Sequence, residues 1–381
     1  MTLPLVVLGA TGSIGAQTLE VADHLGLEVS VLAARSVSDG LVAAARRLPD
    51  ARVIVAGGSS EERESLVGVI GDRVEFGSEA VVAAAGHPGQ IVVNGIVGSA
   101  GLRATVAALE AGNRVALANK ESLVAGGPVV MAAVRAHGGM VIPVDSEHSA
   151  LHQCLAGEPP EAVGRLILTA SGGPFRGRSR ESLAAVEAVE ALRHPTWDMG
   201  PRITIDSATM FNKGLEIVEA HYLFDVEYDR IDVVVHPQSI LHSAVEMVDG
   251  SWKGHLGFPD MRIPIQYAIT WPARAPSPAS PFTLAGMELT FEAPDRLAFP
   301  ALDIAYEAGR AGGSSPAVMN AADEVAVEAF LQGRLGFLGI ADVVQRTLAE
   351  VDWRDLVTVD EVIEVDREAR AVAASLIAGV C

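Results

Sequence analysis

The sequence predicts an α/β protein with an N-terminal Rossmann-like, doubly wound sheet, a central α/β domain and a C-terminal helical domain. Short apolar runs such as "PLVVLG", "ARVIVAG" and "QIVVNGI" alternate with Ala-rich helical stretches over the first 145 residues, and helical periodicity dominates after residue 299. Buried strands separated by helices are typical of parallel sheets that are covered on both faces. A chain of 381 residues is also too long for one modest core.

The expected domain boundaries follow these changes of pattern. Residues 1–145 form a nucleotide-binding domain, and residues 146–270 form a catalytic, ligand-binding domain whose polar loops include a lid near 171–201. The run "WPARAPSPASP" opens a proline-rich linker over residues 271–298. Residues 299–381 form a small helical domain.

Composition excludes several classes of protein. The chain has 28 basic and 48 acidic residues, a formal net charge of −20, so its long-range field repels nucleic acid and anionic membranes and neither is expected as a partner. Its apolar runs all fall short of the ~18 residues that a membrane span needs. With only Cys154 and Cys381, and no export signal evident at the N-terminus, we expect a cytoplasmic protein without a disulfide framework.

A glycine-rich turn follows the first expected strand. "VVLGATGSIG" places Gly9, Gly12 and Gly15 between that strand and a helix, where glycines let a pyrophosphate approach the backbone and the helix N-terminus. The spacing is not GxGxxG, so a turn without a nucleotide is the alternative. The second strand ends in Arg35 and Ser36 rather than in an acid, which favours NADP over NAD unless Arg35 is only a solvated surface residue.

The stretch "VDSEHSALHQ", residues 144–153, combines acids and histidines. By itself it is compatible with a metal site, an acid/base pair or the polar start of a helix. Asp145 and Glu147, joined by Glu216 from a distant part of the chain, would make an oxygen-rich set suited to Mg²⁺ or Mn²⁺ rather than to Zn²⁺. His148 and His152 are four residues apart and align only on a helix.

Further polar groups follow other strands. Asn119, Lys120 and Glu121 should lie at the carboxyl edge of the sheet, where ligands of open α/β folds bind, although a solvated helix start explains them equally well. Ser171, followed by two glycines, is either a small-anion cradle or a plain turn.

Two segments later in the chain supply a loop and a polar helix. "HPTWDMG", with His194, Trp197 and Met199, lies between a helix-like and a strand-like segment and would form a water-excluding lid unless its apolar residues belong to the core. Ser207 is expected at a capping position. The helix after it offers groups for a polyol phosphate and one metal ligand, or simply the polar face of an amphipathic helix: Asn212, Lys213 and Glu216.

Taken together, these motifs resemble those of the 1-deoxy-D-xylulose 5-phosphate reductoisomerase family. The matching blocks include "LGATGSIG", "ALANKESLV", "PVDSEHSA", "ASGGPF", "HPTWDMG", "DSATMFNKGLE", "HPQSILHS" and "NAADEVAVEAFL", and they extend over nearly the whole chain. The resemblance implies a homodimeric, NADPH- and divalent-metal-dependent enzyme. It would isomerise and reduce a small phosphorylated sugar, 1-deoxy-D-xylulose 5-phosphate, to 2-C-methyl-D-erythritol 4-phosphate in isoprenoid precursor biosynthesis.

The resemblance also implies a role for individual positions. NADPH would be bound by Thr11, Gly12, Ser13, Ile14, Arg35, Ser36, Asn119, Glu121 and Gly200. The metal, Mn²⁺ or Mg²⁺, would be held by Asp145, Glu147 and Glu216. The substrate would contact Lys120, Ser146, Glu147, Ser171, His194, Trp197, Ser207, Asn212, Lys213 and Glu216. The implied catalytic residues are Lys120, Glu147, His194 and Glu216.

The chain departs from the family pattern at two places. Ala34-Arg35-Ser36 replaces the usual Gly-Lys/Arg-Asn turn, and this affects the contacts expected for the 2′-phosphate and the preference for NADPH over NADH. Asp323 stands where the family usually has Asn, a change that we expect to be tolerated. His242 and Met261 fall in family motifs without an assigned role. The rival functions are a metal-dependent NADP alcohol dehydrogenase without the isomerase step and an NADP-sensing regulatory protein.

Overall fold

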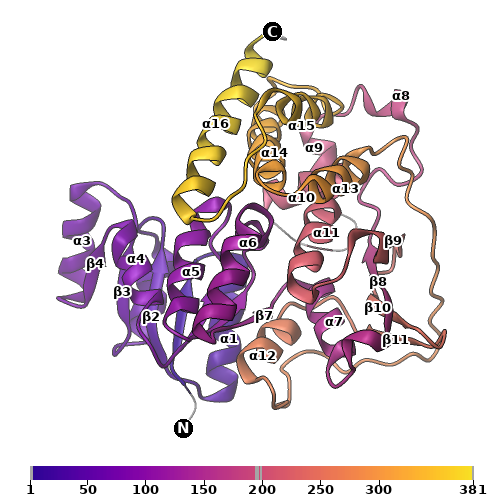
Figure 1. Cartoon of the computed structure of the whole chain (residues 1–381). Coiled ribbons are helices and arrows are strands. Elements are labelled where there is room, and N and C mark those ends of the chain that lie inside the picture. Colours follow the sequence, from indigo (N-terminus) through magenta and orange to yellow (C-terminus); the bar gives the residue numbers. More distant parts are fainter. Residues whose placement is uncertain (1–2, 194–196, 198–199, 380–381) are drawn as a thin grey trace. The chain divides into compact units, whose positions relative to one another are not determined.

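The computed structural model describes residues 3–193, 197 and 200–379 (Figure 1). The chain forms two compact units, each of which is described by itself. Unit 1 comprises Met1–Ser122, Val129–Ser149 and Asp260–Ser280. Unit 2 comprises Leu123–Pro128, Ala150–Pro259 and Pro281–Cys381.

Unit 1 is built on a seven-stranded parallel sheet, which confirms the predicted doubly wound fold. Its spatial order is β4-β3-β2-β1-β5-β6-β7, so the direction of winding reverses between β1 and β5. The strands are β1 (Leu5–Leu8), β2 (Val29–Ala34), β3 (Arg52–Val55), β4 (Val74–Phe76), β5 (Ile91–Asn94), β6 (Arg114–Leu117) and β7 (Met140–Pro143). The sequence pattern did not indicate β4, because this edge strand has three half-buried residues and no apolar run.

Alternate residues of each strand face opposite layers of helices, because side chains alternate along a strand. Leu5 and Val7 join a core with apolar residues of α1, α2, α3 and α12, and α4 and α5 contact the strands from the other side. The helices that lie wholly in unit 1 are α1 (Ser13–Leu25), α2 (Asp39–Arg47), α3 (Ser60–Ile70), α4 (Ser78–Ala85), η1 (Ser99–Gly101), α5 (Leu102–Glu110) and α12 (Arg262–Thr270). Helices α6 (Lys120–His137) and α7 (Ser146–Leu155) are divided between the units, with residues 123–128 and 150–155 counted in unit 2. Residues 260–280 belong to this unit because α12 packs on α1. The sequence pattern predicts instead that these residues are divided between the central domain and the linker.

Unit 2 combines a four-stranded mixed sheet with a group of helices. The strand order is β11-β10-β8-β9, in which β8 and β9 are parallel and the other neighbours are antiparallel. The strands are β8 (Val163–Ala170), β9 (Ile231–Val235), β10 (Leu241–Met247) and β11 (Trp252–Leu256). The helices are η2 (Pro160–Ala162), α8 (Arg180–Leu183), α9 (Ala188–Ala191), α10 (Pro201–Thr209), α11 (Phe211–Phe224), η3 (Tyr228–Arg230), α13 (Ala301–Ala311), α14 (Ser315–Leu331), α15 (Gly339–Glu350) and α16 (Val359–Ala378).

Helix α11 lies at the centre of unit 2. Leu215, Ile217 and Val218 are buried among residues of β8, β9 and α13, and α14 packs in turn against α13, α15 and α16. Gly214 permits the close approach of α13, since a Cβ there would lie 2.8 Å from the Cβ of Ala305. The predicted C-terminal helical region therefore shares one core with the sheet and with α11.

Two local expectations are corrected. The segment after the proposed lid, expected to be strand-like, is helix α10: Gly200 is its N-cap, Pro201 begins it, and its buried positions have helical spacing, which outweighs the β-branched residues. Ser207 lies inside α10 rather than capping a helix, and α11 begins after Met210, which has a left-handed backbone.

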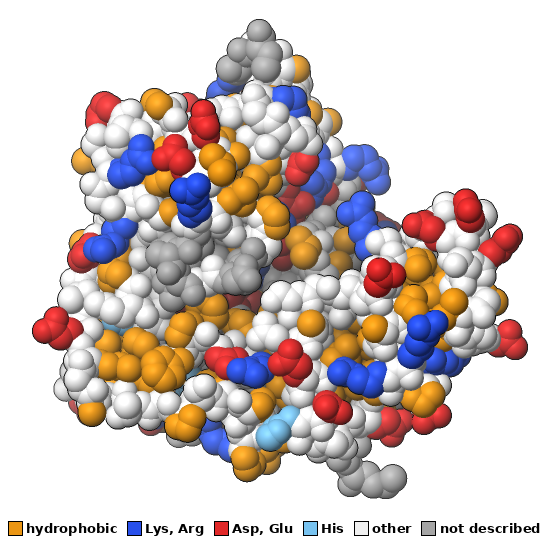
Figure 2. Space-filling model, turned by 180° about the vertical axis from the view of Figure 1, so that it is seen from behind, with side chains coloured by type: hydrophobic (Ala, Val, Ile, Leu, Met, Phe, Trp, Pro, Cys, Tyr) orange, Lys and Arg blue, Asp and Glu red, His pale blue; other side chains and the backbone are white. Residues whose placement is uncertain are grey.

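The surface of the described residues mixes charged and apolar side chains. Among the described residues on the face shown in Figure 2, acidic and basic side chains are interspersed with apolar ones. None of the described helices combines the length and the apolar character needed to cross a bilayer.

Candidate functional site

The turn between β1 and α1 is shaped to bring a ligand against the backbone. Gly9 has φ of +82°, and a Cβ there would lie 2.6 Å from the carbonyl oxygen of Gly95, which follows β5. The turn is therefore at the point where winding reverses, which is where open α/β sheets bind ligands. A Cβ on Gly15 would lie 2.3 Å from the Gly9 carbonyl oxygen, so α1 packs tightly behind the turn.

The N-terminus of α1 is open to an anion. Gly12 is the N-cap residue, and among the described residues no side chain caps the helix by a hydrogen bond. The first turn contains no acidic residue. Amide groups of this turn, around Ser13 and Ile14, are therefore available to a phosphate. Arg35 and Ser36 follow the adjacent strand β2 and are exposed, and the Arg35 carbonyl is fixed by a 2.8 Å hydrogen bond from the Gly57 amide.

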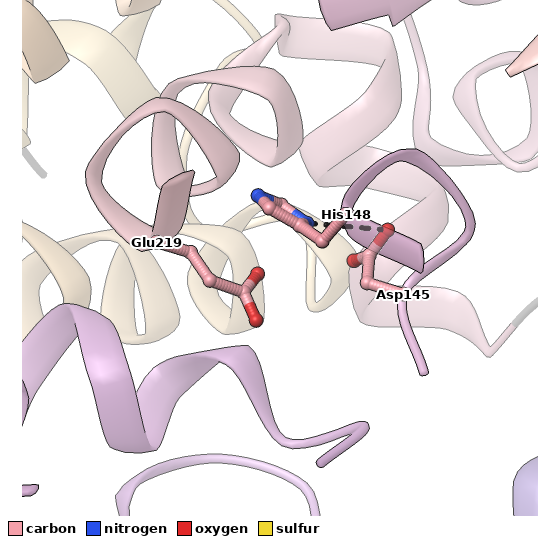
Figure 3. A group of neighbouring side chains, drawn as sticks. All are labelled: Asp145, His148 and Glu219. Atoms are coloured by element: carbon pink, nitrogen blue, oxygen red, sulfur yellow. Dashed lines mark ion pairs between the residues drawn. The ribbon is translucent and has the colours of Figure 1, made fainter. Parts of the chain in front are cut away.

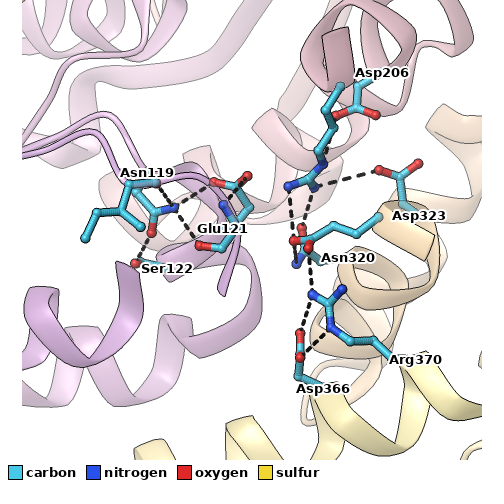
Figure 4. A network of polar contacts seen from close by, with 12 residues as sticks. Asn119, Glu121, Ser122, Asp206, Asn320, Asp323, Asp366 and Arg370 are labelled. Atoms are coloured by element: carbon cyan, nitrogen blue, oxygen red, sulfur yellow. Dashed lines mark hydrogen bonds and ion pairs between the residues drawn. The ribbon is translucent and has the colours of Figure 1, made fainter. Parts of the chain in front are cut away.

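Asn119 ties together the loops after β5 and β6. Its side-chain nitrogen contacts the carbonyl oxygens of Ile96 at 2.7 Å and Gly98 at 2.9 Å, and a carboxylate oxygen of Glu121 at 2.9 Å. Ser122 donates to its side-chain oxygen, and Glu121 also accepts a bond from the Gly98 amide (Figure 4). Both side chains thus shape the carboxyl edge of the sheet through contacts within the protein.

Lys120 and Asp145 form an ion pair in unit 1 between a buried lysine and a half-buried aspartate. The Nζ of Lys120, at the start of α6, lies 2.5 Å from Oδ2 of Asp145, which precedes α7. Oδ1 of Asp145 faces Nδ1 of His148 at 3.8 Å (Figure 3). Burial tends to raise the pKa of Asp145, but Lys120 and His148 outweigh it and hold that pKa well below its ordinary value. Asp145 is therefore an ionised, hard oxygen donor.

Residues of α7 extend this acidic group. Ser146 and Glu147 are the first two residues of the helix, and the Ser146 hydroxyl donates to a carboxylate oxygen of Glu147. His148 and His152 lie one helical turn apart, as their spacing requires. Burial lowers the pKa of His152, which favours its neutral form.

A second polar group lies in unit 2, where β8, α10 and α11 meet. Ser171 follows β8, and its hydroxyl accepts a 3.2 Å bond from the Gly173 amide, so it is part of a glycine turn. A Cβ on Gly173 would lie 2.7 Å from the carbonyl oxygen of Ser207, so this turn contacts the end of α10. The glycine turn that begins at Ser171 therefore lies against the backbone of Ser207.

The N-terminus of α11 continues this group. Its first turn has no acid, and no capping side chain is found among the described residues. Glu216 is buried, and one of its carboxylate oxygens accepts a 2.6 Å hydrogen bond from the side-chain amide of Asn212. Its other oxygen accepts a hydrogen bond from the Lys213 ammonium group. The three side chains share one helical face, as predicted, and combine anion-binding groups with one carboxylate.

The described part of the proposed lid, residues 171–193, 197 and 200–201, includes the short helices α8 and α9. Trp197 is half-buried, and Gly200 is exposed at the start of α10. His194 and Met199 lie outside the described residues.

One buried polar cluster was not anticipated. Arg202 and Asp206 on α10 meet Asn320, Asp323 and Glu324 on α14 (Figure 4). The available signal was the helical register, which places Asp323 among the buried alanines of "NAADEVA".

Comparison with known proteins decides the family. The model described as "1-deoxy-D-xylulose 5-phosphate reductoisomerase" matches residues 5–127, and the models of its C-terminal domains match residues 141–224 and 256–372. The chain belongs to the 1-deoxy-D-xylulose 5-phosphate reductoisomerase family. The family resemblance found in the sequence motifs is confirmed.

Individual reductoisomerases match over almost their whole length. The Chloroherpeton thalassium protein is 47% identical over 371 residues, 96% of each chain. The structure of the Zymomonas mobilis reductoisomerase in complex with NADPH has a TM-score of 0.91 and 43% identity and covers 99% of both chains. A reductoisomerase structure with NADPH, fosmidomycin and magnesium has a TM-score of 0.90 and 36% identity over 98% of both chains.

Proposed function

We propose that this chain converts 1-deoxy-D-xylulose 5-phosphate into 2-C-methyl-D-erythritol 4-phosphate by isomerisation and NADPH-dependent reduction, in isoprenoid precursor biosynthesis. The observation that carries the proposal is the similarity, over 98% of both chains, to a reductoisomerase crystallised with NADPH, fosmidomycin and magnesium. The reductoisomerase family motifs and the glycine turn of unit 1 support the same activity.

The cofactor would lie at the winding reversal of unit 1. Thr11, Gly12, Ser13 and Ile14 would present the α1 N-terminus to its pyrophosphate, because these amides have no competing acid in the first turn. Arg35 and Ser36, exposed after β2, would face the 2′-phosphate, with Arg35 supplying the positive charge. Further along the sheet edge and beyond the lid, the proposed contacts are Asn119, Glu121 and Gly200.

We propose that Asp145, Glu147 and Glu216 hold one divalent cation. Three carboxylates are the donor chemistry of Mg²⁺ or Mn²⁺, and the depressed pKa of Asp145 keeps that ligand ionised. When bound, the metal supplies Lewis-acid stabilisation of negative charge and NADPH supplies hydride. Lys120 beside Asp145 and Lys213 beside Glu216 balance the charge of the buried carboxylates.

The substrate phosphate would bind at the second polar group. Ser171, Ser207, Asn212 and Lys213 offer hydroxyl, amide and ammonium donors near the open N-terminus of α11. Lys120 can hold or move a proton at its Nζ, and Glu147 orients the hydroxyl of Ser146. His194 and Trp197 would complete the set by contacting the substrate and excluding water, as the lid hypothesis proposes.

We further propose that the chain is a homodimer located in the cytoplasm and that Mn²⁺ can take the place of Mg²⁺ at the metal site. Light scattering on the purified chain should give twice the monomer mass, and a monomer at assay concentrations would contradict the dimer. Turnover with each ion in turn should rank the two metals.

The decisive assay follows NADPH absorbance with 1-deoxy-D-xylulose 5-phosphate and Mg²⁺ or Mn²⁺, with and without a chelator. Oxidation that needs both substrate and metal is expected, and carbon-13 NMR should find the branched product. An unbranched polyol phosphate would instead favour the dehydrogenase, and binding without turnover would favour the sensor.

One substitution tests the assignment of Glu216 as a metal ligand. Glu216→Gln should lower turnover by at least about a hundredfold, or ~2.7 kcal/mol of barrier, because it removes one anionic ligand. Glu307→Gln, which changes an exposed carboxylate on α13, is the matched control and should leave turnover unchanged. Undiminished activity in Glu216→Gln would refute the metal assignment.

A further inference from the structure

Three helices of unit 2 meet at two half-buried arginines. The Arg202 guanidinium on α10 lies 3.0 Å from a carboxylate oxygen of Glu324 and donates a 3.3 Å bond to the side-chain oxygen of Asn320, both on α14. Arg370 on α16 donates at 2.6 Å to the other oxygen of Glu324 and at 2.7 and 3.0 Å to Asp366 (Figure 4).

The acids in this cluster outnumber the arginines. Glu324 and Asp366 have close contacts to the two guanidinium groups, whereas Asp206 and Asp323 approach Arg202 only at 3.6 and 3.9 Å. If all four carboxyl groups were ionised, the cluster would have a net charge of −2. Asp206 is 3% exposed and Asp323 is 0% exposed, so water cannot stabilise this excess.

Asp323 lacks the hydrogen-bond donors that a buried carboxylate needs. Neither of its side-chain oxygens has a hydrogen-bond partner among the described residues, and it shares the Arg202 guanidinium with the buried Asp206. Two carboxyl groups can hydrogen-bond only when one of them is protonated. Burial raises the pKa of Asp323 well above its ordinary value, and the negative charge of Asp206 is the second cause of this increase. The positive charge of Arg202 opposes the shift.

Most of the other charged groups on helices α13, α11 and α15, which pack against α14, are paired with other residues or exposed, and one is a buried carboxyl group. On α13, Asp303 pairs with Arg296 and Arg310 pairs with Asp229. On α11, Lys213 pairs with Glu216, and Glu219 is a further buried carboxyl group. The charged residues of α15 are exposed: Asp342, Arg346 and Glu350.

We propose that Asp323 is protonated at neutral pH and donates this proton to Asp206, and that the resulting singly charged pair, with Arg202, positions α10 against α14. Helix α10 begins at Pro201, directly after its N-cap Gly200, and carries Ser207, whose carbonyl oxygen lies against the turn that follows Ser171. The effect on substrate binding rests on the function proposed above. Asp323 is thus a positioning residue for the substrate-binding end of α10.

The proton makes this contact sensitive to pH. Because the pKa of Asp323 is raised in the folded protein, its stabilisation is fully present below the ordinary value of about 3.9 and is lost as pH rises through the folded-state value. Above that value Asp206 and Asp323 would repel each other, and α10 would be held less firmly.

Asp323→Asn is the central test, because an amide is neutral at every pH and can still donate to Asp206. Infrared spectra at pH 7 should show the carbonyl band of a buried protonated carboxyl group in the parent and not in this variant. The unfolding temperature of Asp323→Asn minus that of the parent should increase as pH rises from 5 to 7.5, because only the parent loses stability over this range. The control is Asp342→Asn, which changes a side chain that is 64% exposed. It should keep the infrared band of the parent, and its unfolding temperature relative to the parent should not increase with pH.

Kinetics test the positioning role. Asp323→Asn should keep kcat and KM within twofold of the parent at pH 7, whereas Asp323→Leu, which cannot donate, should raise the substrate KM at least tenfold with a smaller change in kcat. An unchanged KM in folded Asp323→Leu would overturn the positioning role. Absence of the infrared band in the parent, or a difference in unfolding temperature that does not vary with pH, would overturn the shared proton. These two readouts need no substrate, so they remain decisive if the parent does not turn over 1-deoxy-D-xylulose 5-phosphate.

Discussion

Replacing Gly15 with alanine should separate the cofactor turn from the helix behind it. The added Cβ would lie 2.3 Å from the Gly9 carbonyl oxygen and 2.6 and 2.7 Å from Cα and C of Ala10, whereas ordinary contacts begin at 3.4 Å. The turn cannot move away from α1, because Gly9 already packs closely against the carbonyl group of Gly95 on its other side. Helix α1 would therefore have to move by roughly 1 Å, which is the difference between these contact distances.

The energetic cost follows from this displacement. Overpacking of a tight contact costs about 1–3 kcal/mol, while alanine in a helix gains up to about 1 kcal/mol over glycine. The net change in unfolding free energy should be a loss of about 0–2 kcal/mol. The N-terminal amides move with α1, so NADPH affinity should fall at least tenfold, equivalent to about 1.4 kcal/mol.

Calorimetric titration with NADPH and urea unfolding of Gly15→Ala would measure both effects. Gly68→Ala is the matched control, because Gly68 lies in α3 and a Cβ added there would have no atom within 4 Å, and it should gain about 1 kcal/mol of stability with unchanged affinity. The reasoning would be refuted if Gly15→Ala bound NADPH within twofold of the parent and were as stable as the control.

Three further predictions concern other parts of the chain. Tyr228→Phe should stabilise unit 2 by about 1 kcal/mol in urea unfolding, because burial raises the pKa of this phenol and its hydroxyl has no hydrogen-bond partner among the described residues; a loss of stability would contradict this. Asp260→Asn should cost about 1–2 kcal/mol at pH 7, because Asp260 accepts bonds from the backbone and guanidinium of Arg262. These bonds lower the pKa of Asp260, so its stabilisation is present above about pH 4 and lost as pH falls through the folded-state value, and the difference between parent and variant should shrink in acid. Arg35→Glu should raise KM for NADPH at least tenfold while leaving KM for NADH nearly unchanged, and equal effects on both cofactors would rule out a 2′-phosphate contact.

The sequence alone determined six of the seven strands of the unit 1 sheet and the types of residue available for chemistry. Apolar runs such as those of β1 and β5 alternate with helices, and this local periodicity is enough to predict a doubly wound fold. Asn212, Lys213 and Glu216 share a helical face because their spacing fixes it.

Only the tertiary structure decided which distant residues meet. Gly9 approaches Gly95 because the sheet places β1 beside β5, and residues 260–280 join unit 1 because α12 packs on α1. Asp206 and Asp323 are 117 positions apart, and their shared proton depends on burial and mutual distance, which no local pattern encodes. Local periodicity specifies elements, whereas desolvation and pairing of charges are properties of the packed fold.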